Sequence, residues 1–331
     1  MQIKEQVDLT DFNSFGVHAI AAYFTEIQQP HDLNEAMAYA SQHRLPTQIL
    51  GGGSNILFLH DYPGLIVRLA NRAVERLSAP GLLRVAAGEN WHQLVINCMS
   101  EGLYGLENLA LIPGTVGAAP IQNIGAYGVE IEQFIVEVEV FDTATGTVRR
   151  MHKADCEFSY RDSIFKHSRN LIVLSVTLQL LTQQSPQIGY QALRDAFPSG
   201  EVTAQQVFDT VCRIRSSKLP DPAILGNAGS FFKNPIVSKD KYQSLKQQVQ
   251  DLPCYPTAED ELVKIPAAWL LDRLGWKGRQ RGQAAVHTKH ALVLVNLGAA
   301  SGEDIYLLAQ EMSSSILSNF GLSLDTEVKI I

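Results

Sequence analysis

The sequence predicts an α+β protein with two or three domains. Segments with the alternating pattern of strands and segments with the apolar spacing of helices are mixed along all 331 residues, which is typical of this class. At roughly 100–200 residues per domain, the length indicates more than one domain. Hydrophobic residues make up 46% of the chain and charged residues 18%, so a sizeable core can form.

The first elements form a β–α–β unit. Residues 21–27 are a predicted strand, and a helix begins at Asp32, which we expect to form a capping box with Glu35. A second strand over residues 47–50 leads directly into a glycine loop. One face of the helix is apolar at helical spacing and consists of Leu33, Ala36, Met37 and Ala40.

The middle of the chain contains more strands than helices. Residues 65–69 and 82–87 are predicted strands, and residues 91–101 are a predicted helix. Residues 134–142 and 147–151 are separated by a short turn, which predicts a hairpin. In the first hairpin strand we expect an apolar face and an acidic face, formed by Phe134, Val136, Val138 and Val140 and by Glu137 and Glu139.

A change in composition follows a further strand and helix. Residues 171–181 are rich in strand-forming side chains, and a helix begins at Thr203 with Gln206 in a capping box. Residues 218–235 then hold three prolines and two glycines. This segment is too apolar for a linker, and we expect neither a helix nor a strand in it. The core face of the preceding helix is predicted to be Val207, Val211 and Ile214.

The C-terminal part combines three helices and two strands. Helices are predicted over residues 238–249 and 266–274, and a buried strand over residues 291–296. Ser301 begins a third helix in a capping box with the acidic residue three positions later. A last strand is predicted over residues 324–331. The core face of the third helix is predicted to be Ile305, Leu308, Ala309, Met312 and Ile316.

Two glycine-rich stretches are the candidates for ligand binding. Residues 113–130 read PGTVGAAPIQNIGAYGVE, with four glycines, almost no charge and no helical period, and residues 51–55 read GGGSN. Glycines let other groups approach the main chain, and successive N–H groups bind anions such as a pyrophosphate. The alternative is that the first stretch is a buried structural turn and that the second is a hairpin turn.

The composition argues against nucleic acid or a membrane as the main partner. The net charge is −7, whereas binding to a phosphate backbone needs clustered Lys and Arg. The N-terminal residues lack the apolar core of a signal peptide, and no apolar run approaches the roughly 20 residues of a membrane helix. The four cysteines are dispersed and form no CxxC pair, so we expect a reduced, cytoplasmic protein.

Several common catalytic motifs are absent from the sequence. It contains no GxGxxG, GxxxxGK[ST], HExxH or GxSxG pattern, so a Rossmann dinucleotide site is not expected. His287 and His290 are three residues apart, but no third ligand is spaced to join them. We interpret them as ordinary surface histidines and expect no metal site.

Five motifs in order along the chain resemble a known enzyme family. GGGSN at 51–55 and PGTVGAAPIQNIGAYG at 113–128 are similar to the flavin-binding (PCMH-type) domain of the vanillyl-alcohol-oxidase type. SYRDS at 159–163, GNAGSFFKNP at 226–235 and TEVKI at 326–330 make nearly the whole chain resemble the MurB family of UDP-N-acetylenolpyruvoylglucosamine reductases. The region around Tyr190 is similar to the longer, type I members.

The resemblance implies a domain organisation and a reaction. It implies a two-part FAD-binding module over residues 1–70, rejoined by 319–331, and 71–213, with a smaller α+β substrate domain over 214–318. In this family NADPH reduces non-covalently bound FAD, which then reduces the enolpyruvyl ether of UDP-N-acetylglucosamine to UDP-N-acetylmuramate for peptidoglycan synthesis. The implied partners are therefore UDP-N-acetylglucosamine enolpyruvate and NADPH.

The same resemblance implies three catalytic residues. Arg161 and Glu327 act on the carboxylate end of the enolpyruvyl group, where an enediolate develops, and Ser230 donates a proton to the developing carbanion. Without the resemblance, these would be a surface ion-pair residue, a solvated strand residue and a turn residue. Lys329 departs from the family, because an arginine is common at this position.

The resemblance also implies binding residues and leaves two rival functions. The rivals are another FAD-dependent oxidoreductase of the same fold and a non-catalytic flavin-binding protein. The implied cofactor-binding residues are Gly51, Gly52, Gly53, Ser54, Asn55, Pro113, Gly114, Thr115, Gly117, Gln122, Asn123, Gly125 and Ala126. The implied substrate-binding residues are Tyr190, Arg215, Lys218 and Asn234.

Overall fold

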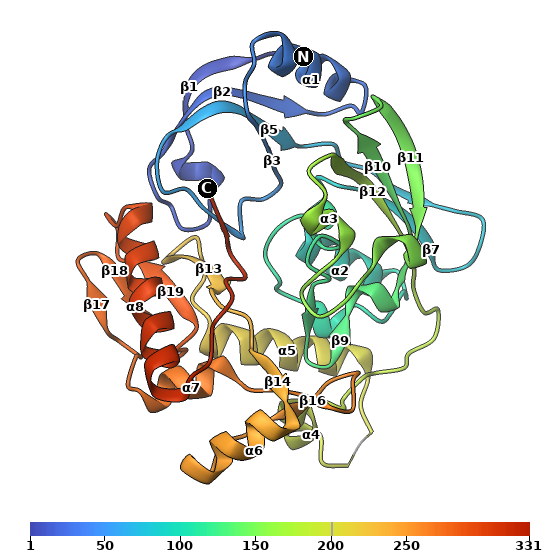
Figure 1. Cartoon of the computed structure of the whole chain (residues 1–331). Helices are drawn as coiled ribbons and strands as arrows, with labels where there is room; N and C mark the ends of the chain where they lie inside the picture. The colour runs from blue at the N-terminus through green and yellow to red at the C-terminus, as the bar shows by residue number, and fades with distance from the viewer. Residues whose placement is uncertain (200) are drawn as a thin grey trace. The chain divides into compact units, whose positions relative to one another are not determined.

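The computed structural model describes residues 1–199 and 201–331, and within it the chain forms two compact units. Each unit combines helices with β-sheets, which confirms the α+β class (Figure 1). The division into three domains stays a prediction. Unit 1 consists of Met1–Val7, Ile20–Gly53 and Tyr62–Ser217, and unit 2 consists of Asp8–Ala19, Ser54–Asp61 and Lys218–Ile331.

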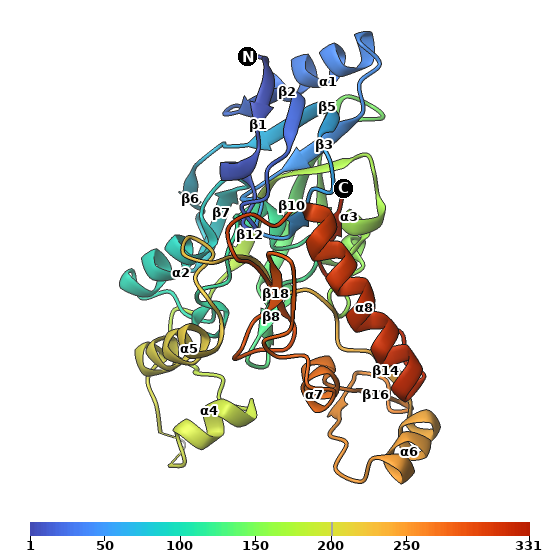
Figure 2. The ribbon, with the colours of Figure 1, turned by 90° about the vertical axis from the view of Figure 1, so that its left-hand side faces the viewer.

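The first sheet of unit 1 contains the predicted β–α–β unit. Helix α1 (Asp32–Gln42) connects two strands that both run parallel to the strand between them. Figure 2 shows α1 beside this sheet, and the buried residues Leu33, Ala36 and Ala40 form its inner face. The four strands in spatial order are β1 (Lys4–Asp8), β2 (Ile20–Ile27), β5 (Tyr62–Leu69) and β3 (Thr47–Leu50).

The predicted capping box at the start of α1 is wrong. The N-cap residue is His31, and no side chain accepts a hydrogen bond there. The Asp32 carboxylate instead accepts from the main-chain N–H of Gln29 at 3.2 Å, outside the helix. The sequence pattern alone does not show whether the Asp32 carboxylate caps the helix or bonds to the main chain before it.

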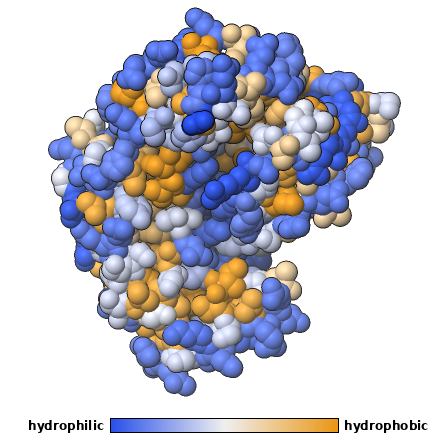
Figure 3. All heavy atoms as spheres, turned by 45° about the horizontal axis from the view of Figure 1, so that its top comes forward, coloured by the Kyte–Doolittle hydropathy of each residue, from blue (hydrophilic) through white to orange (hydrophobic). Residues whose placement is uncertain are grey.

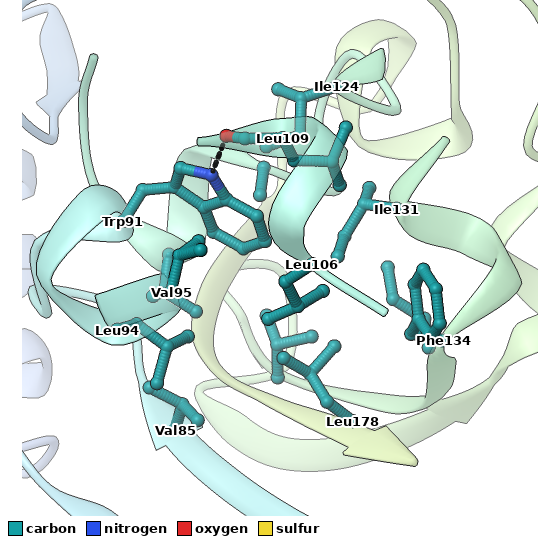
Figure 4. Packing of buried hydrophobic residues seen from close by; sticks show 14 of the residues in the cluster. Val85, Trp91, Leu94, Val95, Leu106, Leu109, Ile124, Ile131, Phe134 and Leu178 are labelled. Carbon is teal, nitrogen blue, oxygen red and sulfur yellow. Dashed lines mark hydrogen bonds between the residues drawn. The ribbon is translucent and has the colours of Figure 1, made fainter. Parts of the chain in front are cut away.

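The second sheet of unit 1 is antiparallel and carries the larger core. Helix α2 (Trp91–Ser100) and the turns after it pack against this sheet, as Figure 4 shows for Leu94 beside Val85 and for Leu106 beside Leu178. The strands in spatial order are β11 (Thr147–His152), β10 (Ile135–Asp142), β12 (Leu171–Gln179), β7 (Leu82–Ala86) and β6 (Val74–Arg76).

The predicted apolar face of the first hairpin strand is partly wrong. The register of β10 against β12 shifts between Ile135 and Glu137, and Val136 is 39% exposed. Such a bulge inserts an extra residue and interrupts the alternation of the two faces. Val138 and Val140 are fully buried, as expected.

The remaining elements of unit 1 are short, apart from one long helix. The capping box at its start is confirmed, because Thr203 N–H donates to Gln206 Oε1 at 2.8 Å and Gln206 N–H donates to Thr203 Oγ1 at 3.2 Å. These elements are β8 (Gly125–Ala126), β9 (Val129–Glu130), α3 (Ile164–His167), α4 (Gln191–Ala196) and the long helix α5 (Ala204–Lys218).

Unit 2 is built on a small antiparallel sheet and the long helix α8 (Gly302–Phe320). The predicted capping box of α8 between Ser301 and Asp304 is confirmed. The sheet contains β13 (Gly226–Ser230), β19 (Val293–Asn296), β18 (Ala284–Val286) and β17 (Gln280–Arg281), in this spatial order. Unit 2 also contains β4 (Ile56–Leu57), β14 (Ile236–Ser238), β15 (Tyr255–Pro256), β16 (Leu262–Lys264), β20 (Lys329–Ile330), α6 (Lys239–Gln248) and α7 (Ala267–Arg273).

Two predictions for unit 2 are wrong. Residues 218–235 do contain a strand, β13, which finds its partner β19 far along the chain. The last strand is much shorter than the predicted 324–331, because only Lys329–Ile330 pairs regularly, in parallel with β4. The partner of β13 is distant in sequence, so the local pattern does not reveal that strand. The apolar pattern overestimates the length of the last strand, because β4 offers only two residues for pairing.

The surface carries apolar groups scattered among polar ones on the face that Figure 3 shows. In the described ranges, no helix combines the length and apolar character needed to cross a bilayer.

Candidate active site

The two glycine stretches lie against each other within unit 1. A Cβ atom added to Gly51 would lie 2.6 Å from Thr115 Oγ1, and one added to Gly52 would lie 3.1 Å from Gly114 Cα. Gly53 and Gly114 have positive φ angles of 64° and 115°, which glycine adopts without strain. Side chains would block this contact, so the two predicted anion-binding loops form one main-chain cradle.

Gly117 extends this cradle toward the second sheet. A Cβ atom on it would lie 2.5 Å from Ala87 Cβ, and its N–H donates to the Ala87 carbonyl at 2.9 Å. The main chain of Gly51, Gly52 and Gly114, from which side chains are excluded, fits the diphosphate of a bound FAD, whereas the N–H of Gly117 is already bonded within the protein. Unit 1 also contains the predicted cofactor residues Pro113, Gln122, Asn123, Gly125 and Ala126, whereas Ser54 and Asn55 belong to unit 2.

Arg161 is held near the end of the glycine stretch over residues 113–130. Its φ of 55° lies in the left-handed region, which is uncommon for a residue with a side chain and often marks a functional site. Its Nη2 donates to the Gly125 carbonyl at 2.5 Å, and its Nη1 lies 3.9 Å from Glu130 Oε1. The guanidinium carbon also lies 5.3 Å from the ring centre of Tyr160. These contacts orient a permanently charged group next to the cradle.

The side chain of Asn123 holds the groups around Arg161 through hydrogen bonds. Its Nδ2 donates to Glu130 Oε2 at 3.0 Å and to the Ser159 carbonyl at 3.1 Å, and its Oδ1 accepts from Glu132 N–H at 3.1 Å. The residue is fully buried. Asn123 therefore holds Glu130 in place beside Arg161, and a contact of its main chain with the cofactor stays a prediction.

Arg215 adds a second guanidinium to this part of unit 1. Burial lowers its pKa and Arg161 acts in the same direction, whereas Tyr127 and Cys212 oppose the shift. Its Nε atom has no hydrogen-bond partner among the described residues. The rings of Tyr127 and Tyr190 meet edge to face with centres 5.5 Å apart. Three predicted residues of the site, Arg161, Arg215 and Tyr190, therefore lie around Tyr127. The two guanidinium groups favour the binding of a carboxylate or phosphate.

In unit 2 the chain brings Ser230 and Glu327 together. Ser230 ends β13 opposite Val293, after a shift of register that begins at Asn227. The main-chain N–H of Glu327 donates to the Phe231 carbonyl at 2.8 Å. Glu327 is thus the donor of this hydrogen bond, and Ser230 directly precedes the acceptor residue. The two predicted catalytic residues of this unit are 97 positions apart in the sequence.

Asn55 connects the first glycine motif to the same segment. Its Nδ2 donates to the Glu327 carbonyl at 3.0 Å, and its own carbonyl accepts from Lys329 N–H at 3.0 Å. Burial lowers the pKa of the Lys329 ammonium. A predicted cofactor residue and a predicted catalytic residue are therefore directly bonded within unit 2.

Two further predicted substrate residues belong to unit 2. Asn234 Oδ1 accepts from Ala267 N–H at 2.9 Å and so caps the start of α7. Lys218 is the last residue of α5, and its positive charge lowers the pKa of the His290 ring. The role of both residues in substrate binding stays a prediction.

His290 is partly buried rather than an ordinary surface histidine. Burial first, and then the charges of Lys218 and Lys277, lower the pKa of its ring to about 4. Its Nδ1 accepts from Leu292 N–H at 3.3 Å, which requires the unprotonated nitrogen. The folded protein therefore holds this histidine neutral at physiological pH.

We expect the free energy of unfolding to fall as the pH is lowered from about 6.5 to about 4. Folding lowers the pKa of His290. The neutral ring therefore contributes its full stabilisation above the ordinary pKa of histidine, and this contribution is lost as the pH falls toward about 4, because the unfolded chain binds the proton first. The loss reaches about 3 kcal/mol at most. Urea unfolding across this range should show a weaker pH dependence for His290→Gln, but not for the exposed control His18→Gln. Equal slopes for all three proteins would contradict this account.

Sequence reasoning missed the residues that support the predicted site. Glu130 lies in the quoted glycine stretch, and Tyr127 lies between two of its glycines, but neither was assigned a role. Glu130 could have been found in the sequence, because it is the one acidic residue at the end of an almost uncharged stretch. For buried amides such as Asn108 and Asn296 the local sequence contains no such signal, because their partners are distant.

Two models of known protein families match different parts of the chain. Residues 21–152 match the family model described as an FAD binding domain, and residues 221–331 match the C-terminal domain of UDP-N-acetylenolpyruvoylglucosamine reductase. The fold and these two matches thus define an FAD-binding oxidoreductase of the α+β class.

Individual relatives are more specific. UDP-N-acetylenolpyruvoylglucosamine reductase from Pseudomonas syringae is 42% identical, over 99% of this chain and 98% of the relative, and that from Shewanella baltica is 45% identical, over 98% and 95%. The crystal structure of the Thermus caldophilus enzyme (MurB) covers 100% of this chain and 99% of its own, with a TM-score of 0.72 at 25% identity. The chain belongs to the UDP-N-acetylenolpyruvoylglucosamine reductase (MurB) family.

Proposed function

We propose that this protein reduces the carbon–carbon double bond of UDP-N-acetylglucosamine enolpyruvate, with NADPH as the electron donor. The observation that carries the proposal is the hydrogen bond from Glu327 N–H to the Phe231 carbonyl at 2.8 Å. It joins the two motifs with which the chain most specifically resembles this family, and it sets Ser230 beside Glu327. We infer a cytoplasmic location from the four free cysteines.

The glycine cradle of unit 1 is the proposed site for the diphosphate of FAD, and Ser54 and Asn55 stay predicted cofactor residues of unit 2. When bound, FAD takes two electrons from the nicotinamide donor and supplies hydride to the substrate double bond. The protein contributes close-packed main-chain N–H groups for the diphosphate, because glycines keep side chains out of the way.

Three side chains carry the remaining chemistry of the proposed reaction. Arg161, always charged, stabilises the negative charge that develops on the substrate carboxylate, and Glu327 acts at the same end of the substrate. Ser230 gives a proton to the carbon next to that carboxylate. Tyr190, Arg215, Lys218 and Asn234 are the proposed contacts of the UDP-sugar.

We expect FAD to be bound tightly but without a covalent bond. The histidines nearest to the glycine stretches are His60 and His92. His92 Nδ1 accepts from Leu111 N–H at 3.1 Å, and its ring stacks on Phe208 with centres 5.8 Å apart. It is therefore engaged within the protein. Precipitation with acid should leave all yellow colour in the supernatant, and flavin that stays with the precipitate would contradict this expectation.

Steady-state turnover tests the proposed function. The purified protein should oxidise NADPH beyond one equivalent per bound flavin only when UDP-N-acetylglucosamine enolpyruvate is present, and mass spectrometry should show a product with two additional hydrogens. Oxidation of NADPH with oxygen alone would favour another FAD-dependent oxidoreductase of this fold. A yellow protein without any turnover would favour a flavin-binding protein that is not an enzyme.

A further inference from the structure

Asn108 is a buried amide that joins two distant segments of unit 1. It is 0% exposed. Its Nδ2 donates to the Tyr127 carbonyl at 3.0 Å and to the Gln187 carbonyl at 2.8 Å, so both of its amide hydrogens are used. Its Oδ1 is buried and has no hydrogen-bond partner among the described residues.

The turn that carries Asn108 is held firmly by its neighbours. The Glu107 carboxylate accepts from Gly105 N–H at 2.6 Å, and burial raises the pKa of Glu107. The indole N–H of Trp91 donates to the Leu109 carbonyl at 2.9 Å, a bond that Figure 4 shows as a dashed line. Asn108 is thus presented from a rigid base in the largest core of the unit.

Both carbonyls that Asn108 holds belong to segments that bear on Tyr190. Tyr127 meets the Tyr190 ring edge to face at 5.5 Å, and Gln187 precedes Tyr190 by three positions in the chain. A Cβ atom on Gly128, the residue after Tyr127, would lie 3.8 Å from Tyr190 Cβ. One amide therefore fixes both the turn on which Tyr190 packs and the segment that leads to it.

We propose that Asn108 is a positioning residue that holds Tyr190 ready for the diphosphate of a UDP-sugar. This inference rests on the proposed function, which assigns Tyr190 to the substrate. Asn108 itself touches neither the substrate nor the reacting atoms. It acts by stabilising the position in which Tyr190 packs on Tyr127, so its effect is on substrate affinity.

A double-mutant cycle tests this coupling. The dissociation constant of the UDP-sugar substrate, measured by calorimetry in the absence of NADPH, should rise about tenfold in Asn108→Leu, which corresponds to about 1.4 kcal/mol. The same change in a Tyr190→Ala background should add nothing, because the residue that it positions is gone. The rate of flavin reduction by NADPH should not change. Asn97→Leu, an Asn→Leu change at an exposed position of α2, is the matched control.

The outcomes of this cycle distinguish a failure of the role of Asn108 from a failure of the proposed function. Equal tenfold losses in both backgrounds, or no loss in either, would overturn the role of Asn108. A wild-type protein that does not bind the UDP-sugar would instead refute the proposed function. If Asn108→Leu does not fold, Asn108→Ser takes its place in the cycle. Limited proteolysis should also cut residues 182–189 faster in the folded Asn108 variant, and an unchanged cleavage rate would again contradict the proposal.

Discussion

Replacing Ser230 by alanine is expected to slow reoxidation of the reduced flavin by the enolpyruvyl substrate by about 10²–10⁴-fold, the usual effect of losing a general acid. Flavin reduction by NADPH should stay near the wild-type rate. The reason is the order of events, because the proton is needed only after hydride has reached the substrate. Stopped-flow absorbance measures each half-reaction separately.

Variants of neighbouring residues sharpen this test. Replacing Arg161 or Glu327 should slow the same second half-reaction, since both are assigned to the developing negative charge. Ser230→Cys keeps a proton donor and should recover part of the rate. Ser238→Ala, which removes a hydroxyl that caps α6 in the same unit, is the matched control and should leave both steps unchanged. If Ser230→Ala slows flavin reduction as much as reoxidation, the serine serves cofactor geometry and is not the acid.

Replacing Gly125 by valine is expected to remove FAD while the fold survives. A Cβ atom there would lie 2.8 Å from Glu130 Cγ, 2.9 Å from Arg161 Nη1 and 3.1 Å from the Val129 carbonyl. The first two neighbours are side chains that can move, but the third is main chain and cannot easily give way. Valine should therefore displace the Arg161 guanidinium and distort the cradle. The sequence left open whether a positive φ would add strain, but Gly125 does not have one, so the obstruction alone causes the loss.

Flavin absorbance per protein and thermal unfolding measure this outcome. We expect the flavin content of Gly125→Val to fall at least about tenfold, with an unfolding transition that remains cooperative. Gly189→Val is the matched control, because a Cβ atom at Gly189 meets nothing within 4 Å and its φ is ordinary. It should keep its flavin. Unchanged flavin content in Gly125→Val would show that this glycine has only a structural role.

The sequence predicted elements whose signals are local. The capping boxes at Thr203 and Ser301 are such signals, because the partner lies three residues away, and both are confirmed. Asp32 shows the limit of the same rule, since its carboxylate bonds to Gln29 outside the helix. The contact between the loops at Gly51 and Thr115 could not be predicted, although both loops were identified as anion-binding candidates.

Features that depend on distant partners were missed for a physical reason. Strand β13 lies in a segment broken by prolines and forms because β19, beginning at Val293, supplies its hydrogen bonds. Asn108 resembles any polar turn residue in the sequence, and its importance appears only when its bonds to Tyr127 and Gln187 are known. The resemblance to the family supplied the candidate catalytic residues, and the structure adds the groups that hold two of them, Arg161 and Glu327.

A single anaerobic turnover tests the central claim most directly. The enzyme is reduced with dithionite instead of NADPH, freed of reductant, and mixed with UDP-N-acetylglucosamine enolpyruvate. The account predicts that the yellow absorbance returns with one equivalent of substrate and that an equal amount of UDP-N-acetylmuramate forms. A flavin that stays bleached in the presence of the substrate, and is reoxidised only when air is admitted, would contradict it.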